Sequence, residues 1–154
     1  MTVARRLRGM GAGFAALALL SLPAVAQSAA PIIDKPFAEH RLALQLSDND
    51  PKKEALIISV AYNLLKYYGP DRIAIEVVTF GPGIDLLRAG YARRPEVDSL
   101  VSQGVQFDIC MNTVETIERE TGKPVAINPH AVKVVAGVAQ ILALTEKGFT
   151  LVRP

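Results

Sequence analysis

The chain has 154 residues, of which 50% are hydrophobic and 21% charged, so it is long enough for one globular domain and too apolar for a disordered protein. It carries 17 Lys and Arg against 15 Asp and Glu, a formal net charge of +2, and no basic run or basic-aromatic pattern follows the first residues. This distribution argues against nucleic acid as a partner.

The N-terminus resembles a secretory signal peptide. A basic segment is followed by a charge-free apolar run and then by Ala24-Val25-Ala26, which fits the small-x-small rule for signal peptidase. We therefore expect residues 1–26 to direct export to the periplasm, with cleavage after Ala26 and no membrane contact afterwards. An uncleaved anchor is the alternative, but Pro23 interrupts the run, which is short of the about 20 residues that span a bilayer.

Removal of this segment changes the charge of the protein. Its three arginines, Arg5, Arg6 and Arg8, would leave with it, so 14 basic residues remain against 15 acidic ones. The apparent basicity of the chain therefore belongs to the signal peptide.

Strand and helix patterns alternate after a small, proline-containing linker over residues 27–38. Asp50 is a predicted N-cap, followed by Pro51 at the first helical position. Turn residues and hydrophobic periodicity predict the remaining boundaries. In chain order the predicted elements are a strand over 41–46, a helix over 51–68, a strand over 73–80, a helical turn over 84–89, a helix over 95–103, a strand over 105–110, a helix over 113–122, a strand over 132–136, a helix over 138–147 and a strand over 149–152.

This alternation predicts a three-layer α/β/α domain over residues 39–154. Its central sheet is expected to be mostly parallel, with about five strands and with helices on both faces. Gln106 and Asp108 alternate with apolar residues in the strand over 105–110, whereas a covered parallel strand is usually apolar throughout. We therefore expect one face of that strand to meet water or another subunit.

Cys110, the only cysteine, follows this strand and is the candidate catalytic residue. Ligands bind at the carboxyl edge of parallel sheets, and a lone thiol in an exported protein suggests a reactive group or pairing between chains. The alternative is a structural cysteine that is buried as a small hydrophobic residue. Asn112 is predicted to cap the next helix, whose first amides near Thr113 favour a thiolate. Asp108 opposes this, because it lies on the same strand face and a nearby carboxylate disfavours a second negative charge.

Other residues at this edge are weaker candidates for the site. Gly81 and Gly83 flank Pro82 after a strand, but without a complete phosphate-binding motif they indicate a tight turn. Asp48 and Asn49 follow the first strand, where a turn and helix capping explain them better than a metal does. We expect no metal and no cofactor.

Four stretches resemble the DsrE/DsrF family and its YchN-like and TusD-like relatives. They are Val77 to Leu87, Gly104 to Cys110, Asn112-Thr113, and Gly137 to Pro154, and the resemblance covers residues 41–154. It implies a parallel α/β fold, assembly into a homotrimer or homohexamer, and a persulfide on Cys110 as in the sulfur-relay members. This chain departs from those members in its export signal and in the residues after Cys110.

Three functions are open from the sequence. The first is a periplasmic sulfur carrier or sulfurtransferase that uses Cys110 with a donor or acceptor protein. The second is a non-catalytic oligomeric binding protein in which Cys110 is structural. The third is a module that binds a metal or a small ligand at the same edge.

Overall fold

A computed structural model describes residues 32–154, so the predicted signal peptide and the first part of the linker, residues 27–31, lie outside the described residues. The elements are β1 (His40–Leu46), α1 (Pro51–Tyr68), β2 (Ile73–Thr79), the 3-10 helix η1 (Gly81–Leu87), α2 (Arg94–Ser102), β3 (Gln106–Cys110), α3 (Met111–Thr121), β4 (Val132–Val134), α4 (Gly137–Glu146) and β5 (Thr150–Val152).

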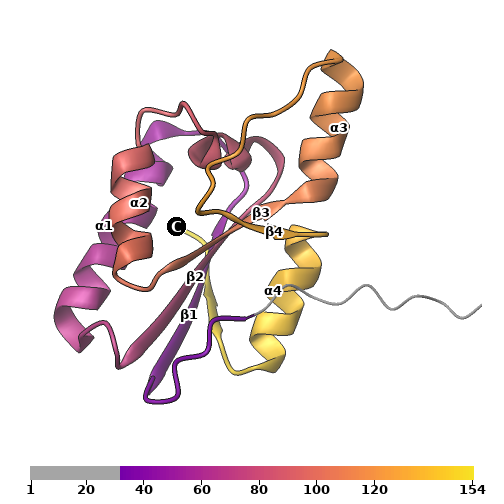
Figure 1. Ribbon diagram of the computed structural model, residues 1–154. Helices are drawn as coiled ribbons and strands as arrows, with labels where there is room; N and C mark the ends of the chain where they lie inside the picture. The colour runs from indigo at the N-terminus through magenta and orange to yellow at the C-terminus, as the bar shows by residue number, and fades with distance from the viewer. Residues whose placement is uncertain (1–31) are drawn as a thin grey trace, which may run out of the picture.

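The sheet has the strand order β4-β3-β2-β1-β5, and all its pairings are parallel. The chain steps from β1 to β4 in one direction and returns across the sheet to β5. Because such crossovers are right-handed, this return places α4 on the face opposite α1 and α2 (Figure 1). The three-layer α/β/α prediction is confirmed, and the sheet is wholly rather than mostly parallel.

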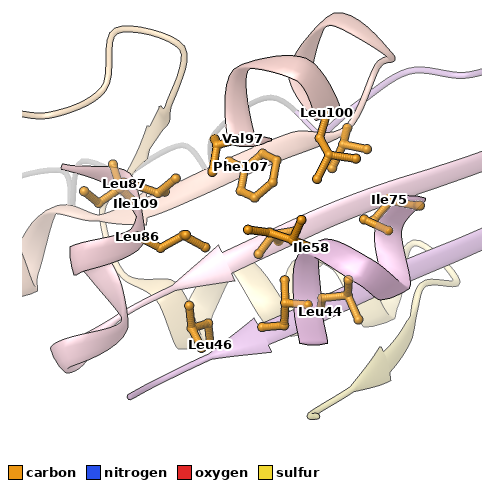
Figure 2. Close-up of a cluster of buried hydrophobic side chains, with 14 of the residues drawn as sticks. Leu44, Leu46, Ile58, Ile75, Leu86, Leu87, Val97, Leu100, Phe107 and Ile109 are labelled. Atoms are coloured by element: carbon orange, nitrogen blue, oxygen red, sulfur yellow. The ribbon is translucent and has the colours of Figure 1, made fainter. Parts of the chain in front are cut away.

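The larger core lies between the sheet and the layer formed by α1, α2 and η1. β2 is central, and all seven of its residues are buried, as expected for a parallel strand covered on both faces. Figure 2 shows the packed side chains, with Phe107 from β3 among leucines and isoleucines of the strands and helices. Burial of each such side chain stabilises the fold by about 1.5–3 kcal/mol.

The opposite face holds a smaller core. Small strand residues such as Ala43 and Ala74 face Ile141 and Leu144 of α4 together with Phe149. The segment over residues 32–38, which precedes β1, packs against the same cluster through Ile32, Ile33 and Ala38. The last residues of the predicted linker therefore pack against the domain.

The start of α3 differs from the prediction. The helix begins at Met111 with Cys110 as its N-cap residue, and no side chain caps it. Asn112 lies within the first turn, and its backbone amide donates to the Val135 carbonyl at 3.1 Å. A tertiary hydrogen bond therefore replaces the predicted Asn112 cap. The predicted cap at Asp50 is confirmed, since its side chain accepts from the Lys52 amide.

Candidate functional site

Cys110 lies at the carboxyl end of β3, where the strand passes directly into α3. It is 5% exposed. Its Sγ is 4.0 Å from the carbonyl oxygen of Val135, which also accepts from the Asn112 amide. Val135 is itself 42% exposed, so a surface segment between β4 and α4 lies over the sulfur.

Three of the predicted site neighbours meet beside Cys110, at the start of α3. A shallow, mostly apolar groove of about 420 Å³ is lined by Gly81, Pro82, Asn112, Thr113, Thr116 and Ile117. The Gly81 amide donates to Thr113 Oγ1 at 3.0 Å, which joins the start of η1 to the first turn of α3. Cys110 does not line this groove but immediately precedes the helix that does.

Gly83 has a packing role behind the groove. A Cβ atom at this position would lie 2.4 Å from the Leu46 carbonyl oxygen, so only glycine allows η1 to approach the end of β1 this closely. The prediction of a tight turn at Gly81 and Gly83 is consistent with the 3-10 helix that begins there.

Asp48 and Asn49 have partners of their own. Asp48 forms an ion pair with Lys53 at 2.7 Å, and Asn49 donates to Asp85 at 3.3 Å. These contacts hold the start of α1 and η1 in place. The structure therefore does not join these two residues to Cys110, although they end a strand of the same sheet.

Asp108 belongs to a buried polar cluster on the α4 face that the sequence prediction did not contain. Register places Glu76 beside Gln106 and Val78 beside Asp108, so both carboxyl groups point to this face. Glu76 accepts hydrogen bonds from the Ile33 amide at 2.7 Å, Gln106 Nε2 at 3.3 Å and Gln140 Nε2 at 3.4 Å. Glu76 and Asp108 are both fully buried.

We predicted that one face of β3 meets water or another subunit. This prediction is wrong at Asp108, because Asp108 is covered by its own chain. An acidic residue inside an otherwise apolar strand, Glu76, was the sequence signal for the cluster. Its partner Gln140 comes from α4, 64 positions further along the chain, and no local sequence pattern indicates this contact.

The carboxyl groups of Glu76 and Asp108 influence each other's pKa, and both pKa values are raised. Burial, followed by the neighbouring Glu76 charge, raises the pKa of Asp108 to about 8, and burial also raises the pKa of Glu76. We place the proton on Asp108, because Glu76 accepts from three donors, whereas Asp108 accepts from Gln106 at Oδ1, at 2.9 Å, and its Oδ2 has no hydrogen-bond partner within residues 32–154. The raised pKa of Asp108 weakens the predicted opposition of an Asp108 carboxylate to a Cys110 thiolate at neutral pH.

Neither histidine is placed to act with Cys110. His40 begins β1, where it packs against Tyr68 with ring centroids 4.1 Å apart, and His130 precedes β4. His40 therefore lies at the amino end of the sheet, opposite the end that carries Cys110, whereas the His130 amide donates to Asn128, which in turn donates to Asp98 of α2.

Residues 32–154 contain no group of three or more His, Cys, Asp or Glu side chains that could hold a metal ion. Within the same residues, the helices are too short or too polar to cross a membrane.

No protein-family model matches the chain, and no curated protein matches it. Among solved structures, the chain is similar to the protein of unknown function MTH1491 from Methanobacterium thermoautotrophicum, with 27% sequence identity and a TM-score of 0.67. The match covers 75% of this chain and 100% of that one. This likeness supports the α/β fold.

Proposed function

We propose that this chain is an exported, periplasmic protein of the DsrE type that binds or transfers sulfane sulfur through a persulfide on Cys110. One observation carries the proposal: the single thiol stands at the carboxyl end of β3 as the N-cap residue of α3. That is the edge at which parallel α/β sheets bind ligands.

The electrostatic surroundings support a reactive sulfur. Helix N-termini stabilise a nearby negative charge by about 0.3–1 kcal/mol, and Cys110 directly precedes the first turn of α3. Burial and the neighbouring Glu76 raise the pKa of Asp108 to about 8, which reduces the opposing charge near Cys110 at neutral pH.

The proposed step is sulfur transfer between thiols. The Cys110 thiolate attacks the outer sulfur of a donor persulfide, a new bond forms to Sγ, and the donor's sulfur–sulfur bond breaks. The donor leaves as a thiolate, which takes a proton from water. An acceptor thiolate then removes the outer sulfur from Cys110 in the same way, so no net oxidant or reductant is needed.

Access to the sulfur depends on the segment that covers it. At 5% exposure, Sγ reaches a donor only when the backbone around Val135 moves away. A partner protein that binds this segment would provide that movement, which fits a relay between a donor and an acceptor protein.

Assembly into a homotrimer or homohexamer is part of the proposal. Val138 and Leu142 on the outer side of α4 are 57% and 59% exposed, and Val135 continues this apolar surface toward Cys110. Exposed apolar surface of this kind is typical of a subunit interface.

A second candidate function is a non-catalytic oligomeric binding protein in which Cys110 is structural. The burial of Cys110 favours it, because a buried cysteine with a weak hydrogen bond to a backbone carbonyl behaves as a small hydrophobic residue.

Alkylation distinguishes the two candidates. The proposal predicts that iodoacetamide modifies Cys110 in the native chain, and that Cys110→Ser keeps the fold and assembly while losing the modification. If Cys110 reacts only after denaturation, and Cys110→Ser unfolds or dissociates the protein, the structural candidate is correct.

A further inference from the structure

The segment over residues 32–38, hereafter the strap, packs on the same face of the sheet as α4. Figure 1 shows it in indigo, leading into β1. The Ile33 amide donates to Glu76 Oε1 at 2.7 Å, and Lys35 Nζ donates to the carbonyls of Pro70 and Ile73 at 2.7 and 3.1 Å. Ile32 and Ile33 pack on the smaller core. One of the two polar anchors of the strap is therefore a carboxylate of the buried pair.

Within residues 32–154, no positively charged side chain pairs with Glu76 or Asp108. Gln106 from β3 and Gln140 from α4 are the side-chain partners of this pair, and both are uncharged. Val132, which pairs with Asp108 on β4, and Ala43, which pairs with Glu76 on β1, are apolar.

The nearby charged groups are directed elsewhere. Lys35 of the strap binds backbone carbonyls, Asp34 is exposed, and the Arg41 guanidinium lies 5.7 Å from the Phe149 ring centroid. A second negative charge on the pair would thus be buried without a cation, beside Asp108 Oδ2, which already lacks a partner.

We propose that the strap is a pH-sensitive closure, which stays over the sheet while the Glu76–Asp108 pair carries one proton and loosens as the pH rises. Loss of that proton leaves two adjacent buried carboxylates, and opening of the strap admits water to them through the position of the Ile33 amide. The geometry makes the strap the movable part, because β2, β3 and α4 are held by the sheet and the cores, whereas the strap is held by Lys35, Ile33 and a few apolar contacts.

The direction follows from proton linkage. With the strap closed, the pKa of Asp108 is about 8, whereas a hydrated aspartate titrates near its ordinary value of about 3.9. Closure is therefore fully favoured at low pH, weakens as the pH rises through this interval, and levels off above pH 8 or so. Within the interval, one pH unit changes the opening equilibrium by up to about tenfold.

Amide hydrogen exchange of the full chain, measured by NMR from pH 5 to pH 9 and corrected for the intrinsic exchange rate, tests this directly. The Ile33 amide should be less protected than the Val77 amide in β2, which shows that the strap opens without global unfolding. Its protection should fall by up to about tenfold per pH unit below pH 8 and then level off.

Two variants separate the pair from other carboxyl groups. Asp108→Asn should make the protection of Ile33 independent of pH, whereas Asp34→Asn, which removes an exposed carboxyl group within the strap, should retain the wild-type dependence. If Asp108→Asn does not fold, the infrared band of a protonated carboxyl group in the wild-type chain should disappear as Ile33 protection levels off. The proposal is overturned if Ile33 protection is constant with pH, if Asp108→Asn keeps the dependence, if Ile33 and Val77 exchange together, or if no such band is present.

Discussion

Two residues on β3 have opposite surroundings although they are only two positions apart. Burial and the neighbouring Glu76 raise the pKa of Asp108, whereas Cys110 lies at the end of the strand under the surface segment at Val135. Asp108 and Cys110 lie on the same face of the strand. An ionised Asp108 would therefore place a negative charge near the Cys110 thiol, whereas a protonated Asp108 would not.

This arrangement predicts a pH-dependent effect of Asp108→Asn on the alkylation of Cys110. Below pH 7, wild type and variant should react with iodoacetamide at the same rate, because Asp108 is already neutral. Above pH 8 the variant should react faster, since wild-type Asp108 ionises and disfavours the thiolate. Pseudo-first-order alkylation rates across this range provide the measurement, and a variant that is already faster at pH 6 would contradict it.

The sequence was informative about some site residues and not about others. Cys110, Gly81 and Thr113 could be placed together because the carboxyl ends of adjacent parallel strands meet at one edge. Glu76 could not be joined to Asp108, because that contact depends on the register of β2 and β3 and on Gln140 arriving from a distant helix.

The 3-10 helix η1 includes a close approach of two backbone segments. Its Gly83 lies against the backbone of Leu46, and this contact sets the groove beside α3. A side chain larger than hydrogen would force η1 away from β1.

Gly83→Ala should therefore lower the free energy of unfolding by about 1–3 kcal/mol, because the added methyl group overlaps backbone atoms that cannot move independently. Gly90→Ala is the matched control, since nothing lies within 4 Å of the Cβ position there. Urea denaturation of both variants measures the difference. Equal stabilities would show that η1 adjusts freely.

The start of α3 shows why local signals were insufficient at the element scale. Asn112 and Glu115 resemble a capping box, yet the helix begins earlier, at Met111. The Val135 carbonyl, which belongs to the loop after β4, accepts a hydrogen bond from the Asn112 amide and so fixes the start of the helix. In contrast, α1 follows its local cap, because Asp50 and Pro51 act within the helix itself.

At the scale of the whole molecule, buried carboxyl groups make stability depend on pH. Burial raises the pKa values of Asp108, Glu76 and Glu54, so the folded state binds protons more tightly than the unfolded chain. The stability that this provides is complete below their unfolded pKa values and is lost as the pH rises through the folded values.

The free energy of unfolding should thus decrease between pH 5 and pH 8, by at most about 1.4 kcal/mol per unit for each raised group. Asp108→Asn should show a shallower decrease, because it removes the group with a pKa of about 8. Urea denaturation at each pH gives the slopes. Identical slopes for the two proteins would exclude Asp108 as the source.

We predict assembly into a homotrimer or homohexamer from the exposed apolar surface of α4. Light scattering should give the mass of a trimer or a hexamer, and Leu142→Asp should reduce it by placing a charge in the interface. Leu56→Asp on α1 is the control, because this residue is similarly exposed, at 48%, on the opposite layer and should leave the assembly intact. A monomer mass for the wild-type chain would contradict the prediction.

The central claim is that Cys110 carries sulfane sulfur, and intact-mass spectrometry after incubation with a persulfide donor tests it most directly. The wild-type chain should gain the mass of one sulfur atom, lose it on treatment with a thiol acceptor, and yield a modified peptide that contains Cys110. Cys110→Ser should gain nothing under the same conditions. A wild-type chain that stays unmodified while a free-cysteine control takes up sulfur would contradict the claim.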